Sequence, residues 1–290
     1  MRSEQQMYNL ILEMAGEDDR IRAVFLNGSR ANPKIEKDKY QDYDVVFVVE
    51  ETASFLADRS WLEPFGTPLI IQEPDLMDVY NGGAQNFSNK YTWLMLFNDG
   101  NRIDLRIMLE EEAYTTCMEE AFTVSLLDKD GILPQVLPSA GEQYLVKRPE
   151  AGQYRACCNE FFWCLNNLAK GIARDELPYV MEMYYSVIHP ELRKMLGWYI
   201  GIQFDFSVST GKMNKYFKKH LPSEIYKRYI STYTDGEYEH IWSAVFNACD
   251  LFHQIALLVG NRLGFVYYDE EERNMREYLL KIKHDRYVIE

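Results

Sequence analysis

The sequence predicts an α+β fold, in which a mixed β-sheet with accompanying helices is followed by an all-helical region. In the first half of the 290-residue chain, short apolar runs rich in β-branched residues alternate with turns. After Pro149 these runs give way to longer segments with apolar residues at helical spacing. The composition, 47% hydrophobic and 26% charged, is that of a globular protein with a sizeable core. We therefore expect two domains, residues 1–148 and residues 149–290.

Strands are expected where short β-rich runs are bounded by turn residues. These runs cover residues 21–26, 42–49, 69–71, 91–97 and 102–109. Within the second run, residues 45–49 (VVFVV) are apolar on both faces, which is typical of a central strand. The last two runs flank residues 98–101 (NDGN), a glycine-containing loop that predicts a hairpin.

Helices are expected where apolar residues recur every three or four positions. The expected segments are residues 4–13 in the first domain and residues 158–169, 179–188, 191–202, 213–220, 241–259 and 270–283 in the second. Gly260 is the expected C-terminal stop of the longest segment, and Asp269 is the expected N-terminal cap of the last one. The second domain is therefore predicted to be entirely helical.

The formal net charge of −14 argues against nucleic acid as a substrate, because neutralising phosphates requires a surplus of Lys and Arg. An acidic surface would instead attract a polycationic small molecule. An equally good explanation is that the acidity serves solubility alone, since the charge of a whole chain is a weak guide to one site. The charge therefore narrows the class of substrate without naming it.

The sequence predicts a cytoplasmic protein. No run of about eighteen apolar residues is present, so we expect no membrane span. The first six residues (MRSEQQ) are polar and lack the apolar core of a signal peptide. The five cysteines form an odd set without a C-x-x-C pair, which is typical of reduced, mostly buried thiols.

Three aspartates are the candidate metal-binding and catalytic residues. Asp42 and Asp44 open the second strand two positions apart, so both side chains project from the same face. Like charges at this spacing repel unless a cation lies between them, and magnesium prefers carboxylate oxygen. Asp104, on the polar face of the last predicted strand, would add a third carboxylate if the two strands are neighbours. Alternatively, the first two form an exposed strand start, and Asp104 pairs with Arg102 or Arg106 along its own strand.

The turn after the first strand, Gly28-Ser29-Arg30, is a candidate phosphate-binding segment. Glycine allows a phosphate to approach the backbone closely, and a helix N-terminus offers free N–H groups to its oxygens. Ser29 adds a hydroxyl and Arg30 adds a cation. Gly-Ser turns are also common in loops, so the segment alone is better explained as an ordinary turn.

The pair Gly211-Lys212 does not complete a phosphate-binding P-loop. That motif requires a glycine about five residues before the pair and a Ser or Thr after it, and this chain has neither. Lys212 and Lys215, one turn apart on an expected helix, can still contact triphosphate oxygens as point charges. The alternative is a solvated basic face of that helix.

The order of these features resembles a known superfamily. A strand, Gly-Ser, about a dozen residues, Asp-x-Asp opening an apolar strand and a later strand with one Asp resemble the nucleotidyltransferases related to DNA polymerase β. Residues 25–33 (FLNGSRANP) and 38–47 (DKYQDYDVVF) are more closely similar to aminoglycoside 6-adenylyltransferases, which act on streptomycin. The resemblance continues through residues 157–163 (CCNEFFW), 169–171 (AKG) and 206–212 (FSVSTGK), and so covers most of the chain.

The resemblance implies an enzyme that transfers AMP from ATP to a hydroxyl of streptomycin, releases pyrophosphate and confers antibiotic resistance. Asp42 and Asp44 are expected to bridge two magnesium ions, and Asp104 to hold the ion nearer the attacking hydroxyl. Glu182, in the helix expected at residues 179–188, is the candidate general base by its place in the resemblance. A solvated helix face is the alternative for Glu182, in which case Asp104 or metal binding alone would serve the hydroxyl.

The nucleotide side of the site follows from the same resemblance. Gly28 and Ser29 are expected to hold the phosphates, and Arg30 to help neutralise the departing pyrophosphate. Lys212 is expected to contact the nucleotide, because it lies in a segment that carries the resemblance. We expect a monomer whose partners are ATP and a cationic aminoglycoside, with neither nucleic acid nor a membrane among them.

Two other functions stay open. The first is the same chemistry on another acceptor, such as a different antibiotic, a protein or a nucleic acid, of which the acidic chain disfavours the last. The second is a nucleotide-binding regulatory module whose catalytic centre has decayed. The three intact aspartates count against this module, because a decayed site has no chemical need for convergent carboxylates.

Overall fold

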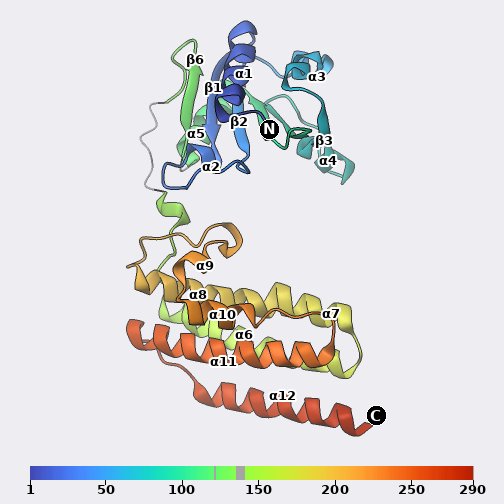
Figure 1. Ribbon diagram of the computed structural model, residues 1–290, viewed down its shortest axis with the longest axis vertical. Helices are drawn as coiled ribbons and strands as arrows, with labels where there is room; N and C mark the ends of the chain where they lie inside the picture. The colour runs from blue at the N-terminus through green and yellow to red at the C-terminus, as the bar shows by residue number, and fades with distance from the viewer. Residues whose placement is uncertain (121, 135–140, 290) are drawn as a thin grey trace. The chain divides into compact units, whose positions relative to one another are not determined.

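The structure is a computed structural model that describes residues 1–120, 122–134 and 141–289, without the side chains of residues 286–289 (Figure 1). The chain divides into two compact units, Met1–Gln143 and Tyr144–Glu290, each described here by itself. The first unit combines a sheet with helices and the second is helical, so the predicted α+β class is confirmed. The second unit begins at Tyr144, close to the boundary expected at residue 149.

The first unit is built on a six-stranded sheet in the order β3-β4-β5-β2-β1-β6. Its strands are β1 (Ile21–Asn27), β2 (Tyr43–Val49), β3 (Pro68–Gln72), β4 (Lys90–Phe97), β5 (Arg102–Met108) and β6 (Val124–Asp128). The five predicted strands and the β4–β5 hairpin are confirmed. Strands β2 and β5 pair in parallel, whereas every other neighbouring pair in this sheet is antiparallel. The prediction missed β6, an edge strand whose residues are all exposed or only half-buried.

The helices of the first unit cover both faces of the sheet. They are α1 (Glu4–Glu17), α2 (Gly28–Ala31), α3 (Ala53–Ala57), the 3-10 helix η1 (Ser60–Phe65), α4 (Pro74–Tyr80) and α5 (Glu110–Glu119). Helix α1 buries its apolar side in the main core, and α5 buries Ala113 and Cys117 in a smaller core with Val46 and Val48. The central strand β2 is therefore covered on both faces, as its uninterrupted apolar run predicts.

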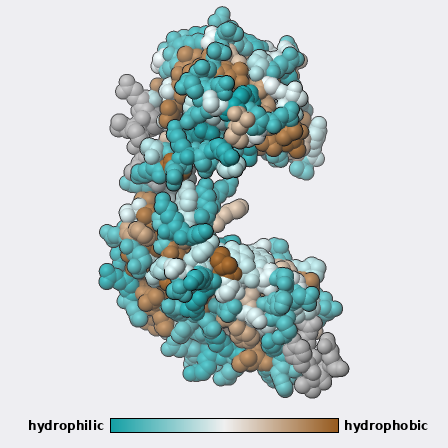
Figure 2. Space-filling view, in the orientation of Figure 1, coloured by the Kyte–Doolittle hydropathy of each residue, from teal (hydrophilic) through white to brown (hydrophobic). Residues whose placement is uncertain are grey.

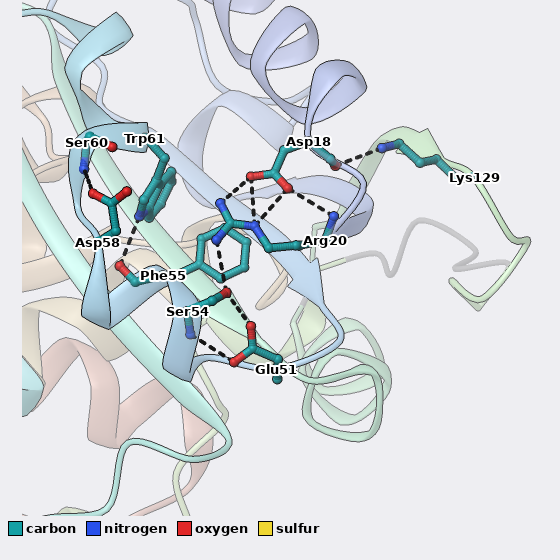
Figure 3. A network of polar contacts seen from close by, with 9 residues as sticks. All are labelled: Asp18, Arg20, Glu51, Ser54, Phe55, Asp58, Ser60, Trp61 and Lys129. Atoms are coloured by element: carbon teal, nitrogen blue, oxygen red, sulfur yellow. Dashed lines mark hydrogen bonds and ion pairs between the residues drawn. The ribbon is translucent and has the colours of Figure 1, made fainter.

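A polar network fixes the end of the sheet where β1 begins (Figure 3). Asp18 accepts hydrogen bonds from the Arg20 guanidinium at 2.5 to 3.1 Å, and Lys129 donates to the Asp18 carbonyl. Arg20 also donates to the Ser54 hydroxyl and lies over the Phe55 ring, 4.0 Å from its centroid. The network thus ties α1, β1, α3 and the segment after β6 together, at the opposite end of β1 from Gly28.

The edge strand β3 exposes apolar side chains. Leu69, Ile70 and Ile71 are 63%, 64% and 42% exposed. The space-filling view shows a brown patch in the region where Figure 1 labels β3 and α4 (Figure 2). This departs from the usual burial of aliphatic side chains.

The second unit is a helical bundle around one large core. The helices and turns are α6 (Ala151–Ala173), α7 (Leu177–Glu182), the π-helix η3 (Met183–Ile188), α8 (His189–Gln203), the 3-10 turn η4 (Lys212–Asn214), α9 (Phe217–His220), α10 (Ser223–Ile230), α11 (Tyr238–Leu263) and α12 (Asp269–Ile289). A further 3-10 turn, η2 (Glu142–Tyr144), lies at the boundary of the two units. The stacked rings of Phe161 and Phe252, 4.0 Å apart, join α6 to α11 in the core.

Four details of the helical prediction are wrong. Asp269 is the first residue of α12 and not the cap that precedes it. Residues 213–220 do not form one helix. Met213 and Asn214, in η4, have φ of 54° and 62°, and these left-handed conformations interrupt the helix before α9 begins. Gly260 does not stop α11, which ends at Gly264 in the left-handed conformation that glycine adopts easily. Helix α10 was missed, because its eight residues bury only Ile225 and Tyr229 and follow Pro222 directly.

Helix α11 is long and apolar enough to cross a membrane by length and composition. Over its most apolar stretch, 56% of the residues are buried inside the second unit. That burial is the pattern of a core helix, and such helices pass the same test of length and composition.

Candidate active site

The three predicted aspartates meet at one end of two neighbouring strands. In the parallel pair β2–β5, Asp44 is the register partner of Asp104, and Tyr43 is the partner of Ile103. Asp42 directly precedes β2 and therefore lies level with Arg102. Side chains two apart on a strand share a face, so the three carboxylates and one guanidinium lie on the same face of the sheet.

The Arg102 guanidinium lies between two of these carboxylates. Its Nε and Nη2 donate to the two oxygens of Asp104 at 2.7 and 2.8 Å, and its Nη1 is 3.4 Å from Asp42 Oδ2. The pairing of Asp104 with Arg102, which the sequence left as an alternative, is therefore present together with the convergence on Asp44.

Asp44 is the least supported of the three carboxylates. Burial, together with the negative charges of Asp104 and Asp42 and against the lowering effect of Arg102, raises its pKa to about 6. The pKa of Asp42 is also raised, because the effect of burial outweighs the lowering effect of the Arg102 charge. Among the residues that the structure describes, no hydrogen-bond donor to the Asp44 carboxylate is found. The site thus favours a bound cation, which would remove the cost of ionising Asp44.

Gly28 lies against the same carboxylate. It has φ of +71°, and a Cβ atom at this position would overlap Asp44 Oδ2 and come within 2.8 Å of Asp44 Cγ. The register explains the approach, because Asn27 at the end of β1 pairs with Asp44. Glycine is therefore required here for backbone conformation and for space, whatever ligand the turn holds.

Arg30 has a different place from the one expected. Its guanidinium is buried, donates to the carbonyls of Gln41 and Asp42 at 2.8 and 3.1 Å, and lies 3.7 Å from the centroid of the Tyr43 ring. Arg30 also pairs with Glu4 at 3.6 Å. These contacts fix the backbone from which Asp42 projects, and they favour a positioning role over neutralisation of pyrophosphate. Ser29, next to Arg30, is half-buried.

The donor set fits magnesium in its chemistry, although not in its present arrangement. All three candidate ligands are carboxylates, the oxygen donors that magnesium prefers, and the Gly28 backbone lies directly against one of them. Across the described part of the chain, no group of three His, Cys, Asp or Glu side chains is arranged to hold a metal ion. The ion pairs of Arg102 with Asp42 and Asp104 account for this difference, because they engage oxygens that a metal would need.

The two remaining predicted site residues belong to the second unit. Lys212 is exposed at the start of η4, and the break after it removes the helical spacing that was expected to align it with Lys215. Lys215 instead lies over the ring of Tyr216, 5.3 Å from its centroid. Glu182 is exposed at the last position of α7, where the helix changes to the π-helical turn η3.

The second unit also has a pocket that the sequence did not reveal. Its volume is about 360 Å³, and its lining includes Arg193, Lys194, Trp198, Thr210 and Asn214. Lys194 Nζ donates to both carboxylate oxygens of Glu191 at 2.6 and 2.7 Å, so Arg193 and the Trp198 indole are the groups that suit an anion attached to a ring system. The available signal was the segment at residues 206–212, whose resemblance extends to Thr210 at the pocket wall.

Comparison with known proteins identifies the family of the chain. Residues 1–282 match the family model described as streptomycin adenylyltransferase. The aminoglycoside 6-adenylyltransferase of Bacillus subtilis is 34% identical over 273 residues, covering 94% of this chain and 95% of the relative. That of Campylobacter jejuni is 34% identical, with coverage of 100% and 99%, and that of Staphylococcus aureus is 30% identical, with 96% and 98%.

A crystal structure of an aminoglycoside 6-adenyltransferase from Bacillus subtilis aligns with 98% of this chain and 99% of its own, at 30% identity and a TM-score of 0.48. The identity and coverage of the three curated relatives extend over both units, and the family model does so as well. The chain therefore belongs to the streptomycin adenylyltransferase family and is a nucleotidyltransferase.

Proposed function

We propose that this enzyme transfers AMP from ATP to a hydroxyl of streptomycin and releases pyrophosphate, so that it confers resistance to the drug. The observation that carries the proposal is the convergence of Asp42, Asp44 and Asp104 beside Gly28 at one end of the sheet. The printed names of the three relatives, all aminoglycoside 6-adenylyltransferases, support the class of acceptor.

Asp42, Asp44 and Asp104 are the residues that would hold two magnesium ions. The metal supplies charge neutralisation on the triphosphate and acidifies the acceptor hydroxyl. Asp42 and Asp44 would be shared between the ions, and Asp104 would lie nearer the hydroxyl. The raised pKa of Asp44 supports the proposal, because a carboxylate that ionises at a cost is stabilised by a divalent cation.

On the nucleotide side, the Gly28-Ser29 turn would accept the phosphates. Gly28 keeps the space beside Asp44 free of side-chain atoms, and Ser29 offers its backbone and hydroxyl. Lys212 is retained as a nucleotide contact, since it lies two residues after Thr210, which lines the pocket of the second unit together with Arg193. Arg30 would act through the backbone, by holding the carbonyl of Asp42.

On the acceptor side, Glu182 is the proposed general base, and Asp104 is the alternative. The exposure of Glu182 at the end of α7 leaves its carboxylate free to accept a proton from a bound drug. The net charge of −14 supports a cationic acceptor and disfavours nucleic acid. The five free cysteines, all buried, support a cytoplasmic enzyme, and we retain the monomer as the expected state.

The test is pyrophosphate release from ATP and Mg²⁺, with and without streptomycin. The wild-type enzyme should release pyrophosphate only with the drug, and Asp42→Asn should abolish the release. Asp38→Asn, in the exposed loop before the site, is the matched control for loss of one carboxylate and should stay active. Release with another acceptor alone would contradict the substrate, and ATP binding without any release would favour the decayed regulatory module.

A further inference from the structure

Arg102 is the one cation in direct ion-pair contact with the aspartates of the active site, among the residues described. Its two nitrogens form a bidentate pair with Asp104, a geometry that is stronger than a single hydrogen bond. Its third nitrogen lies 3.4 Å from Asp42. One side chain therefore bridges two of the three carboxylates that are proposed to hold the metal.

On the β4 side, the described neighbours of Arg102 on this face are apolar. On the neighbouring strand β4, the register partners of Arg102 and Asp104 are Leu96 and Leu94. Partners in an antiparallel pair share a face, so the flank opposite Asp42 is apolar. Attraction to the aspartates thus determines where the guanidinium lies.

The guanidinium can leave this position without disturbing the core. The Arg102 side chain is 41% exposed and that of Asp42 is 39% exposed, whereas Asp104 is 20% exposed. A long, half-exposed side chain can rotate toward solvent at little cost. The carboxylates, by contrast, are held by two paired strands and by the backbone contacts of Arg30.

From this geometry we propose that Arg102 is a displaceable counter-ion of the active site. It neutralises and holds Asp42 and Asp104 while no divalent cation is bound, and it competes with the cation for the same carboxylate oxygens. Arg102 therefore weakens metal binding to the free enzyme. When the metal binds, the guanidinium is released from Asp42 and Asp104. The proposal rests on the function proposed above, because it assumes that these aspartates bind the metal.

The test is the dissociation constant of Mn²⁺, measured by calorimetry or by the electron paramagnetic resonance of free Mn²⁺. Arg102→Gln should bind Mn²⁺ about three- to tenfold more tightly than the wild type, because one competing ion pair is removed. Arg102→Lys, which keeps the charge but loses the bidentate geometry, should lie between the two. Unchanged or weaker binding by Arg102→Gln would overturn the proposal, since a purely structural residue cannot oppose the metal.

Arg106→Gln is the matched control. Arg106 lies four positions after Arg102 along β5 and on the same face, but its Nε donates to the Thr92 hydroxyl. Its removal takes the same charge from the same strand without breaking a contact to the aspartates, so the affinity should change less than about twofold. An equal gain in both variants would reduce the effect to net charge and would overturn the specific role of Arg102.

A further variant separates this proposal from the function on which it rests. Asp104→Asn should weaken Mn²⁺ binding in the presence of α,β-methylene-ATP, an analogue that cannot transfer AMP. If neither the wild type nor any variant binds Mn²⁺, with or without the analogue, the metal site itself fails. If Asp104→Asn weakens binding but Arg102→Gln does not strengthen it, the counter-ion role alone fails.

Discussion

Two buried or half-buried carboxylates in this molecule have opposite surroundings. In the second unit, the Glu272 side chain is 8% exposed and accepts hydrogen bonds from His253, Tyr267 and Arg276 at 2.6 to 2.7 Å. In the first unit, Asp44 is half-buried, faces two other carboxylates, and has no donor within the part of the chain that is described.

The difference indicates that the Glu272 carboxylate has a structural role and the Asp44 carboxylate a functional one. The donors around Glu272 come from α11, α12 and the segment between them, so its charge joins these elements. Asp44 joins nothing, and its ionisation is opposed by its neighbours. A carboxylate that is costly in the free protein is expected where a ligand will supply the missing positive charge.

The largest effect is expected for activity at the unsupported carboxylate. Asp44→Asn should lower kcat/KM for AMP transfer at least about a thousandfold, because a proposed metal ligand is lost. Glu272→Gln should leave kcat/KM within about tenfold at temperatures where it stays folded. Pyrophosphate release measured over a range of ATP concentrations gives kcat/KM for both variants. Comparable losses in the two variants would break the distinction between the two carboxylates.

Stability should respond in the opposite order. Glu272→Ala should lower the free energy of unfolding of the second unit by about 3 kcal/mol, since His253 and Tyr267 lose their buried acceptor and Arg276 keeps only its pair with the exposed Asp250. Glu277→Ala, on the exposed side of the same helix, is the control and should change it by less than about 0.5 kcal/mol. Urea denaturation followed by circular dichroism measures both. Equal effects would mean that the Glu272 network contributes nothing specific.

A side chain placed beside Asp44 should be costly. Gly28→Ala introduces both a strained φ and an overlap with the carboxylate, whereas Gly131 has nearly the same φ, +70°, with nothing within 4 Å of the added Cβ. Gly28→Ala should therefore destabilise the protein by about 1 to 3 kcal/mol more than Gly131→Ala does. Denaturant midpoints of the two variants give the difference. Matching midpoints would show that the backbone conformation, and not the close approach, requires glycine.

The smallest effect is on the pH dependence of stability. Because the folded-state pKa of Asp44 is raised to about 6, the folded protein binds more protons than the unfolded chain between about pH 4 and 6. The contribution of Asp44 to stability therefore falls as the pH rises through this window and stays low above it. The measurement is the free energy of unfolding of Asp44→Asn minus that of the wild type, in a chelating buffer. This difference should be about 1 to 2 kcal/mol more favourable to the variant at pH 8 than at pH 4.

The control for this last measurement is Asp38→Asn, which removes a carboxylate from the exposed loop. Its stability relative to the wild type should change little between the two pH values. A wild-type profile that Asp44→Asn leaves unaltered would mean that Asp44 is not held at a cost. Added Mn²⁺ should reduce the difference between the wild type and Asp44→Asn, because the cation favours the ionised carboxylate.

The sequence predicted the elements that carry strong apolar patterns. The run Val45 to Val49 identified the central strand, and the alternation around Asp104 identified β5. That these two strands are neighbours was a hypothesis in the sequence, because no local pattern determines which strand lies beside another. Their parallel pairing was not predicted. Strand β6, with its half-exposed residues, had too weak a pattern to be found.

The contacts of individual arginines could not be predicted in the same way. Arg30 and Arg102 both lie beside the aspartates in space, yet Arg30 is buried over Tyr43 and Arg102 bridges Asp42 and Asp104. A long cationic side chain can follow several directions from one backbone position, and tertiary neighbours select among them. The sequence could pair Asp104 with either Arg102 or Arg106, and only the register with Thr92 separates the two.

The buried cysteines are built-in probes of local unfolding. Burial raises the pKa of all five thiols, so alkylating reagents should react with them only when the surrounding structure opens. Cys117 belongs to the first unit, and Cys157, Cys158, Cys164 and Cys249 belong to the second. The alkylation rate at each position, read by peptide mass spectrometry, would therefore time the opening of the catalytic sheet and of the helical bundle separately in one sample of the unmodified protein.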